Sequence, residues 1–373
     1  VGLPVLYPFI QNEFGLSHAQ VGLITSALAI GYAAVVILAG RLSDIFGVKR
    51  MITIAMLAMT TFTLAFPLAY SFSTVLILAF LIAITACAVH PATTTAIMDW
   101  FPNRIRGLAM SIKQTGVPIA GTITAAVLPA LAILIGWRMA AASTGLLVLG
   151  TAIAFILLYH DAPRGIQPVR KFNIASLITI LRNRGLVITI FWGAASVGLQ
   201  FTTLSYFVLF LIEELEWSPI MAGGMLAISQ FTSIIARVLL GAVSDFIFRG
   251  RRIVVLAITG FLTVFWMLGI SLTGVGVPSI IVYLIAIVTG ISTLSFHGVF
   301  HALCGEQSEA GQIGMTIGLV GAVTHISMMV MPPLFGYLVD ITSLYNLAWR
   351  VTAAVALVCT LALLAFGRER QHL

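Results

Sequence analysis

Two basic residues, Arg237 and Lys113, lie within long apolar stretches of the sequence, where a charged side chain is costly and usually serves a function. A guanidinium such as that of Arg237 can bind a carboxylate through two parallel hydrogen bonds. The twelve acidic residues all fall at the ends of the apolar stretches or between them. A ligand held by these bases would therefore supply the negative charge itself, which favours a small anion. The alternative for both bases is a side chain that extends past the end of its apolar stretch to reach water.

Other polar side chains in the apolar stretches could complete such a site. An imidazole can carry a proton near neutral pH, so His325, close to the centre of its stretch, is either a proton carrier or a hydrogen-bonded structural residue. His90 is followed by a proline and could instead mark a helix kink. Tyr32 offers a hydroxyl that suits an amphipathic substrate, although core packing or a helix contact is the more common role of such a residue. The predicted substrate-binding residues are Arg237, Lys113, Gln114, His325, His90 and Tyr32.

The composition excludes a soluble protein. Of the 373 residues, 60% are hydrophobic and only 8% are charged, and the mean hydropathy is +1.11. A soluble domain has about 45–50% apolar and about 25% charged residues. This comparison excludes a soluble enzyme, and with it a DNA-binding interpretation of the net charge of +7. Three cysteines without paired spacing predict neither a disulfide framework nor a metal site, and no cofactor is expected.

Twelve apolar stretches, separated by charges, glycine and proline, have the length and composition of helices that span a bilayer. The chain starts within apolar sequence and without methionine, so the first stretch is interpreted as the truncated end of a helix. Strand-type alternation is absent, which disfavours a membrane barrel. The sequence thus predicts an all-α membrane protein with twelve transmembrane helices. The predicted spans are 1–12, 18–40, 51–70, 73–98, 107–133, 138–159, 185–212, 219–242, 253–273, 278–302, 312–338 and 347–367.

The basic residues outside the spans are distributed unequally between the two sides of the predicted membrane. Arg138 and Arg350 fall on one side, and all the others fall on the opposite side. Because basic loops stay in the cytoplasm, we expect a multi-pass protein of the cell inner (cytoplasmic) membrane with a cytoplasmic C-terminus. Attraction to the anionic inner leaflet accounts for the net charge, so the lipid bilayer, and not nucleic acid, is the expected partner.

The two halves of the chain resemble each other. The sequence GRLSDIFGVKR at 40–50 closes the second predicted span, and GAVSD at 241–245, followed by three arginines, closes the eighth. A polar, basic segment separates six spans from six. The predicted domains are an N-terminal six-helix bundle at 1–159, a cytoplasmic linker at 160–184 and a C-terminal six-helix bundle at 185–373. Parallel repeats of this kind place a substrate path between the bundles.

The pattern at 40–50 resembles the loop signature of the major facilitator superfamily, and its degenerate copy at 241–252 lies where this family repeats it. The resemblance implies two pseudo-symmetric bundles that rock around a central site. The second copy departs from the pattern, since Ala242 replaces the first base and Phe248 a usual glycine. The resemblance further implies a gating role, through ion pairs and helix-end contacts that bridge the bundles, for Gly40, Arg41, Asp44, Arg50 and Asp245. For the bases alone, the positive-inside rule is an alternative explanation.

Arg237 precedes Asp245 by eight residues. This spacing is similar to that of monocarboxylate, oxalate/formate and nitrate/nitrite porters, a resemblance which implies that the arginine grips the anion. The stretch 106–116, which contains Lys113, resembles bacterial organic-anion members of the superfamily. Small residues allow helices to approach each other closely. We therefore interpret the glycines of 116–121, and those at Gly314, Gly318 and Gly321, as close-packing helix faces.

We expect a secondary active transporter, not an enzyme, that moves a small organic anion, a monocarboxylate, by alternating access, as proton symport or anion exchange. No Walker-type loop is present to bind ATP, and the family resemblance implies a monomer. The alternative is a proton-coupled drug or metabolite exporter with a neutral or cationic substrate, which a carboxylate in the missing part of the first helix would favour. A ligand-binding membrane sensor is a weaker alternative, because such proteins carry a signalling extension.

Overall fold

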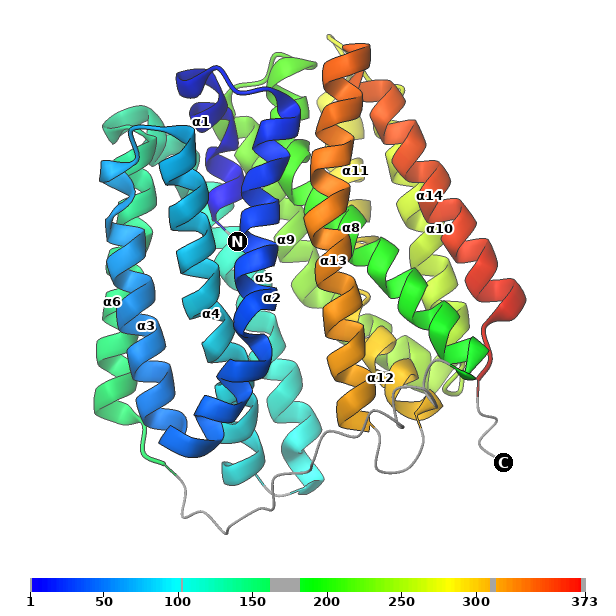
Figure 1. The fold of residues 1–373 in the computed structure, drawn as a ribbon. Helices are drawn as coiled ribbons and strands as arrows, with labels where there is room; N and C mark the ends of the chain where they lie inside the picture. The colour runs from blue at the N-terminus through cyan, green and yellow to red at the C-terminus, as the bar shows by residue number, and fades with distance from the viewer. Residues whose placement is uncertain (1, 102, 162–181, 309–312, 370–373) are drawn as a thin grey trace.

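The computed structural model describes residues 2–101, 103–161, 182–308 and 313–369, without the side chains of 36–46, 90–91, 95, 98–99, 103–108, 111 and 313–315. Throughout these ranges the regular secondary structure is helical (Figure 1). Eleven helical segments within them are long and apolar enough to cross a membrane. The prediction of an all-α membrane protein is therefore confirmed.

The helices follow the predicted spans closely. The first half of the chain contains η1 (Leu3–Leu6), α1 (Tyr7–Phe14), α2 (His18–Phe46), α3 (Val48–Leu64), η2 (Phe66–Leu68), α4 (Phe72–Trp100), α5 (Asn103–Ile135) and α6 (Trp137–Leu158). The second half contains α8 (Arg184–Glu213), α9 (Pro219–Ala242), the π-helical turn η3 (Val243–Ile247), α10 (Arg252–Ile270), α11 (Ser279–Ser292), α12 (His297–Gln307), α13 (Ile313–Thr342) and α14 (Tyr345–Phe366). The span expected at 278–302 corresponds to one apolar segment, Ser279–Gln307, but its helix is interrupted and forms two helices, α11 and α12, with a break between them.

Each half forms its own set of packed helices, and the halves meet along two helix pairs. In the first half α4 packs against α2 and α3, and α6 packs against α3 and α5; in the second half α14 packs against α8 and α10, and α9 against α11. The contacts between the halves run along α2 with α13 and along α5 with α9. In Figure 1, α2 and α13 lie together at the top and separate towards the bottom. The predicted linker, 160–184, lies mostly outside the described residues.

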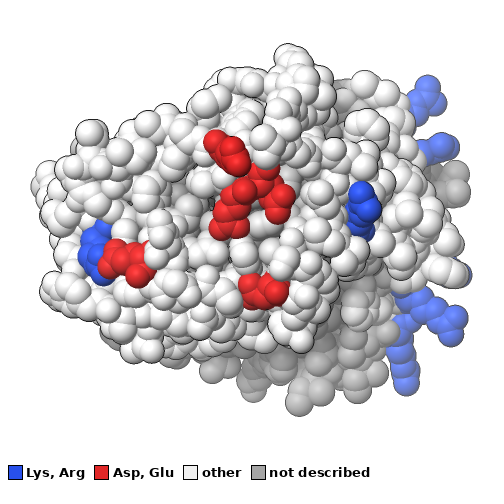
Figure 2. All heavy atoms as spheres, turned by 90° about the horizontal axis from the view of Figure 1, so that it is seen from above, with Lys and Arg blue, Asp and Glu red and all other residues white. Residues whose placement is uncertain are grey.

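One end of the molecule, at the top of Figure 1, carries acidic side chains at the ends of α1, α8 and α13. Figure 2 views this end and shows acidic residues gathered near its middle, with few basic ones. We call it the acidic end, and its acids are Glu13, Glu213, Glu214, Glu216 and Asp340. The opposite end carries Arg50, Arg184 and Arg252 at helix starts. The expected sidedness, in which the acidic end faces outwards, rests on this charge asymmetry and stays a prediction.

Arg138 ties three segments of the first half together at the acidic end. Its Nη1 and Nη2 donate to the two carboxylate oxygens of Glu13 at 2.7 and 2.5 Å, and Nε and Nη2 also donate to the carbonyl of Ala69. The indole N–H of Trp137 donates to Glu13 at 2.6 Å. The hydrogen bonds from Arg138 hold the pKa of Glu13 below its ordinary value, against a smaller opposing effect of burial.

We expect Glu13→Gln to lower the thermal midpoint of the purified protein at about pH 6 by about 1–3 °C. A carboxyl whose pKa is lowered by folding stabilises the fold above its unfolded pKa, near 4.5, and loses that effect as the pH falls through the folded value. The difference between wild type and variant should therefore shrink below pH 4.5. Glu216→Gln, at an exposed acid of the same end, is the control. A difference that does not change with pH would contradict the assignment.

Candidate functional site

Arg237 is a charged side chain that joins the two halves. It is half-buried on α9. Its Nε and Nη2 donate to the carbonyl of Leu294 at 3.2 and 2.9 Å, and its Nη1 donates to the carbonyl of Gln114 at 3.1 Å. Leu294 belongs to the second half and Gln114, on α5, to the first. The guanidinium therefore bridges the halves through backbone oxygens, and Gln114 takes part through its carbonyl.

Both carbonyls are available because the helices that carry them are interrupted. Four positions after Gln114, α5 contains Pro118, which has no N–H to donate to the Gln114 carbonyl. In the second half, Leu294 lies in the break between α11 and α12. A carbonyl freed inside a membrane-spanning bundle needs another donor. Arg237 supplies that donor on both sides of the interface.

The hydrogen bonds of Arg237 leave part of its guanidinium for a ligand. A guanidinium has five N–H groups. Three hydrogen bonds leave two N–H groups, one on Nη1 and one on Nη2, without a partner among the described residues. Two N–H groups on adjacent nitrogens form the fork that a carboxylate accepts with both oxygens. The geometry is thus compatible with an anion at Arg237.

The link between Pro118 and Arg237 can be tested by a double-mutant cycle. In the wild type, Arg237→Gln leaves the Gln114 carbonyl without its donor, whereas Pro118→Ala restores a helical N–H for that carbonyl. We therefore expect the destabilisation caused by Arg237→Gln to be about 1 kcal/mol smaller in the Pro118→Ala protein than in the wild type. Thermal unfolding in detergent measures the difference. Pro129→Ala, at the other proline within α5, is the control and should be additive with Arg237→Gln.

A histidine pair lies beside the break that holds Leu294. The ring of His297 stacks on Phe296 with centroids 4.3 Å apart, and its Nδ1 is shielded from solvent without a hydrogen-bond partner in the described part of the chain. Arg237 is close enough to act on it electrostatically. Nδ1 of His301 lies 2.7 Å from the His297 carbonyl, to which it donates. The unsatisfied His297 nitrogen adds a second polar group to the surroundings of Arg237.

The other predicted binding residues form separate contacts. Lys113 on α5 donates from Nζ to Oγ1 of Thr94 on α4 at 2.7 Å, within the first half. The rings of Tyr32 on α2 and His325 on α13 stack with centroids 4.4 Å apart and so connect the halves. The side chain of His90 lies outside the described residues. The structure therefore brings Arg237 to Gln114, and Tyr32 to His325.

A groove of about 320 Å³ opens beside the ring of His325, between α2 and α13. Nδ1 of His325 lies 2.7 Å from the Gly321 carbonyl and donates to it, so the neutral ring carries its lone pair on Nε2. Small side chains on α2 make the room for the groove. Its lining consists of Ala29, Ile30, Ala33, Ala34, His325, Ile326 and Met329.

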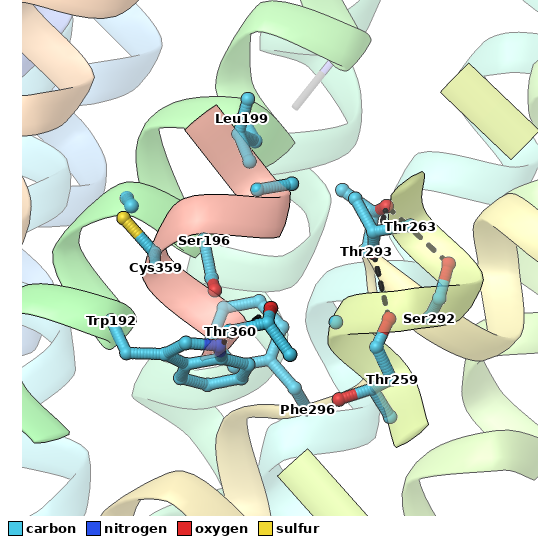
Figure 3. A pocket seen from close by; sticks show the side chains of 13 residues that line it. Trp192, Ser196, Leu199, Thr259, Thr263, Ser292, Thr293, Phe296, Cys359 and Thr360 are labelled. Atoms are coloured by element: carbon cyan, nitrogen blue, oxygen red, sulfur yellow. Dashed lines mark hydrogen bonds between the residues drawn. The ribbon is translucent and has the colours of Figure 1, made fainter. Parts of the chain in front are cut away.

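A second cavity lies within the second half, enclosed by α8, α10, α11 and α14. Figure 3 shows hydroxyl groups around it, including a chain from Thr263 to Thr293, 3.1 Å apart, and on to Ser292. Trp192 also lines the cavity, and its indole N–H donates to the hydroxyl of Thr360. The volume of about 10 Å³ admits a single water molecule. This cavity is therefore too small for an organic substrate.

The residues of the predicted gating motif are only partly described. The surroundings of Gly40 and the side chains of Arg41 and Asp44 are not described, and Arg50 is exposed near the start of α3. Asp245 pairs with Arg252 at 3.1 Å, and Arg252 also pairs with Glu306 at 2.6 Å. All three residues belong to the second half. In this structure Asp245 thus forms an ion pair within its own half, and its gating role stays a prediction.

The tightest approach between the halves involves glycines that the sequence analysis did not single out. A Cβ atom on Gly22 of α2 would lie 2.6 Å from the backbone of Pro333 on α13, and one on Gly336 would meet the carbonyl of His18. Conversely, the close packing predicted at Gly116, Gly318 and Gly321 is wrong for the described residues, because a Cβ at each would find none of their atoms within 4 Å beyond its own helix backbone. Spacing along one helix does not reveal which face meets another helix.

Membrane-spanning helices in two halves, with a half-buried cation at their interface, are the arrangement found in transporters built from two repeats. The chain belongs to the Major Facilitator Superfamily, whose family model matches residues 2–296. The resemblance drawn from the sequence is thereby confirmed, and the chain is a transporter and not an enzyme.

Similar proteins agree with this assignment. The chain is 22% identical to the hexuronate transporter of Bacillus subtilis, over 98% of this chain and 90% of that protein. It is 32% identical to a probable sulfoacetate transporter of Cupriavidus necator, over 44% of this chain and 38% of that protein. Among solved structures, the nucleoside transporter NupG superposes with a TM-score of 0.80 at 13% identity, covering 98% of this chain and 95% of that one. The last comparison supports the fold alone.

Proposed function

We propose that the protein is a secondary active transporter of a small organic anion, a monocarboxylate, held at Arg237. The observation that carries the proposal is the guanidinium between the halves with two N–H groups directed to no described residue. The relatives named as hexuronate and sulfoacetate transporters support an acidic substrate. The distribution of acids supports it too, because those of the described spans lie at helix ends.

The binding of the anion would be coupled to movement of the halves by charge. A lone guanidinium in a closed, low-dielectric interface is unfavourable. A carboxylate on the free Nη1 and Nη2 groups neutralises it and lowers the free energy needed to close the site. Since Arg237 contacts both the Leu294 and the Gln114 carbonyl, the bound anion lies where a rocking motion opens and closes the interface.

The proposal includes coupling by proton symport or by anion exchange. His325 is a candidate proton carrier, since its Nε2 lone pair is available and its ring stacks on Tyr32 of the other half. The proposed arrangement is a monomer in the cell inner membrane with the acidic end outside and the C-terminus in the cytoplasm. The charge asymmetry between the ends supports this orientation.

Uptake and counterflow in proteoliposomes test the proposal. We expect labelled monocarboxylates, such as a hexuronate, to exchange across the membrane, and the matching neutral sugar or amide to be excluded. An entrapped pH indicator distinguishes symport, which acidifies the lumen, from exchange, which requires anion on both sides. Transport of the neutral analogue at a rate equal to that of the acid would contradict an anion site. A thermal-shift screen of organic acids, sugars and cationic drugs identifies the first substrate to label.

A further inference from the structure

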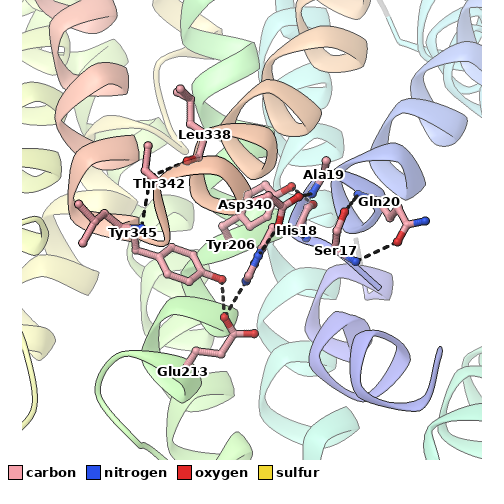
Figure 4. Close-up of polar contacts among 11 residues, drawn as sticks. Ser17, His18, Ala19, Gln20, Tyr206, Glu213, Leu338, Asp340, Thr342 and Tyr345 are labelled. Atoms are coloured by element: carbon pink, nitrogen blue, oxygen red, sulfur yellow. Dashed lines mark hydrogen bonds and ion pairs between the residues drawn. The ribbon is translucent and has the colours of Figure 1, made fainter. Parts of the chain in front are cut away.

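A histidine of the first half lies between two carboxylates of the second half at the acidic end (Figure 4). His18 begins α2, and its Nδ1 is 2.8 Å from Oδ1 of Asp340 on α13. Its Nε2 is 2.8 Å from Oε2 of Glu213 at the end of α8. These two ion pairs connect helices separated by more than 190 positions in the chain.

The two contacts require a bound proton. A carboxylate accepts hydrogen bonds, and an imidazole donates from both ring nitrogens only when it is protonated. A neutral ring would direct a lone pair at one of the two carboxylates. If the proton resided on a carboxyl group instead, the cluster would still hold one proton more than its fully deprotonated form. The arrangement therefore belongs to a protonated state of the three groups together.

Asp340 also joins the halves through the backbone at the start of α2. The N–H groups of His18 and Ala19 donate to the two oxygens of Asp340, each at 2.8 Å, so a carboxylate of the second half caps a helix of the first. The N–H of Ser17 donates to the side chain of Gln20, and the N–H of Gln20 donates to the hydroxyl of Ser17. This reciprocal cap leaves the N–H groups of His18 and Ala19 for Asp340.

Phenolic groups complete the surroundings of the cluster. From α8, Tyr206 donates to the carbonyl of His18 at 2.7 Å, and from α14, Tyr345 donates to Glu213 at 2.8 Å. Glu214 follows Glu213 and adds negative charge near Tyr345. The described charged groups around His18 are thus carboxylates, and each of them favours a proton on its ring.

The cluster is reachable from water. The side chains of His18, Asp340 and Glu213 are 21%, 23% and 33% exposed, so a proton can enter and leave from the acidic end without crossing the protein. Loss of that proton leaves two carboxylates facing a neutral ring. Deprotonation therefore removes the attraction between the His18 ring on α2 and the carboxylates on α8 and α13, and it turns a ring lone pair towards one of these carboxylates. The contacts that hold the halves together at this end are weakened, and the end opens.

We propose that His18, Asp340 and Glu213 form a proton-binding site whose occupation closes the acidic end of the transporter. This inference deepens the proposed function, since a proton taken up at the outward end would close that end during the cycle. It does not depend on which substrate is carried. The site differs from the histidine considered for coupling above, because it acts on the gate and not on the anion.

Spin labels on the full-length protein, without substrate, test the inference separately from transport. Leu68→Cys and Leu272→Cys place labels on exposed turns of the two halves at the acidic end. We expect the short-distance population to dominate at about pH 5.5 and the ratio of short to long distances to fall by about tenfold or more by about pH 8.5, as linkage to one proton allows. Failure of organic-anion uptake would overturn the proposed function but leave this result unaffected.

Variants of the cluster identify the group that titrates. His18→Gln should remove the dependence on pH, whereas His160→Gln, at an exposed histidine of the basic end, should retain it. Glu213→Gln removes one carboxylate, and the transition should move to lower pH while the helix cap by Asp340 remains. A distance distribution in the wild type that is the same at both pH values would overturn the inference. An unchanged transition in both His18→Gln and Glu213→Gln would do so as well.

Discussion

Replacing Arg237 by glutamine is expected to reduce uptake of the transported anion by at least about 30-fold in proteoliposomes. Removal of one partner of a buried, hydrogen-bonded charge pair costs about 2–5 kcal/mol, which corresponds to this loss or more. Glutamine retains a donor but carries no charge, so the carboxylate would enter the interface unpaired. The loss should affect binding, measured as thermal stabilisation by substrate, as well as the transport rate.

Two further variants test whether the loss depends on the planar fork of Arg237 and on its position in the interface. Arg237→Lys keeps the charge but lacks the planar fork, and we expect an intermediate loss of about tenfold. Arg251→Gln removes an exposed arginine at the basic end and should stay within about twofold of the wild type. Wild-type uptake by a folded Arg237→Gln protein would remove this residue from the binding site.

The second large effect is expected at the glycines where α2 meets α13. Gly22→Ala places a methyl group 2.6 Å from the Pro333 backbone and the Tyr206 hydroxyl, and Gly336→Ala places one against the His18 carbonyl. Backbone atoms cannot move aside as the end of a flexible side chain can, so the acidic end cannot close fully. We expect each substitution to reduce transport by about tenfold or more, since overpacking costs about 1–3 kcal/mol.

The defect at these glycines should be conformational. Both glycines lie on the surface between the halves. Within its own half, the nearest atom that the methyl group of Gly336→Ala would meet is the hydroxyl of Tyr206, which is the end of a side chain and not backbone, so the protein should still be made and purified. Spin labels at Leu68 and Leu272 should report a larger long-distance population than in the wild type. Gly318→Ala, on the same helix as Gly336 but with open space around its Cβ, is the matched control. Equal distance distributions in Gly336→Ala and Gly318→Ala would contradict the steric argument.

The cationic character of the interface was predictable, but its geometry was not. A charged residue within an apolar span is conspicuous in the sequence, and Arg237 was found in this way. The sequence did not indicate that its partners would be the carbonyls of Leu294 and Gln114. Pro118 was a visible signal for one of them, because a proline within a helix always frees the carbonyl four residues earlier. The break at Leu294 left no comparable mark, and the span containing it was predicted as one helix.

The cluster at the acidic end illustrates the same limit. Ser17 and Gln20 have the spacing of a helix cap, so the start of α2 at His18 could be inferred from the chain. The proximity of His18 to Asp340, which lies 322 positions away, could not. Contacts of this kind depend on how the two halves are positioned relative to each other.

The membrane class, the helical architecture and most of the helix bounds could be read from the sequence, because the length and apolarity of each span are local properties. The flanking charges predict the sidedness in the same way. The packed fold was needed to show which glycine faces meet, which carbonyls Arg237 reaches and which carboxylates surround His18. Lipid solvates every apolar helix face almost equally well, so hydropathy cannot rank them. The choice among faces is made by close packing and polar pairing between helices, which exist only once the halves have come together.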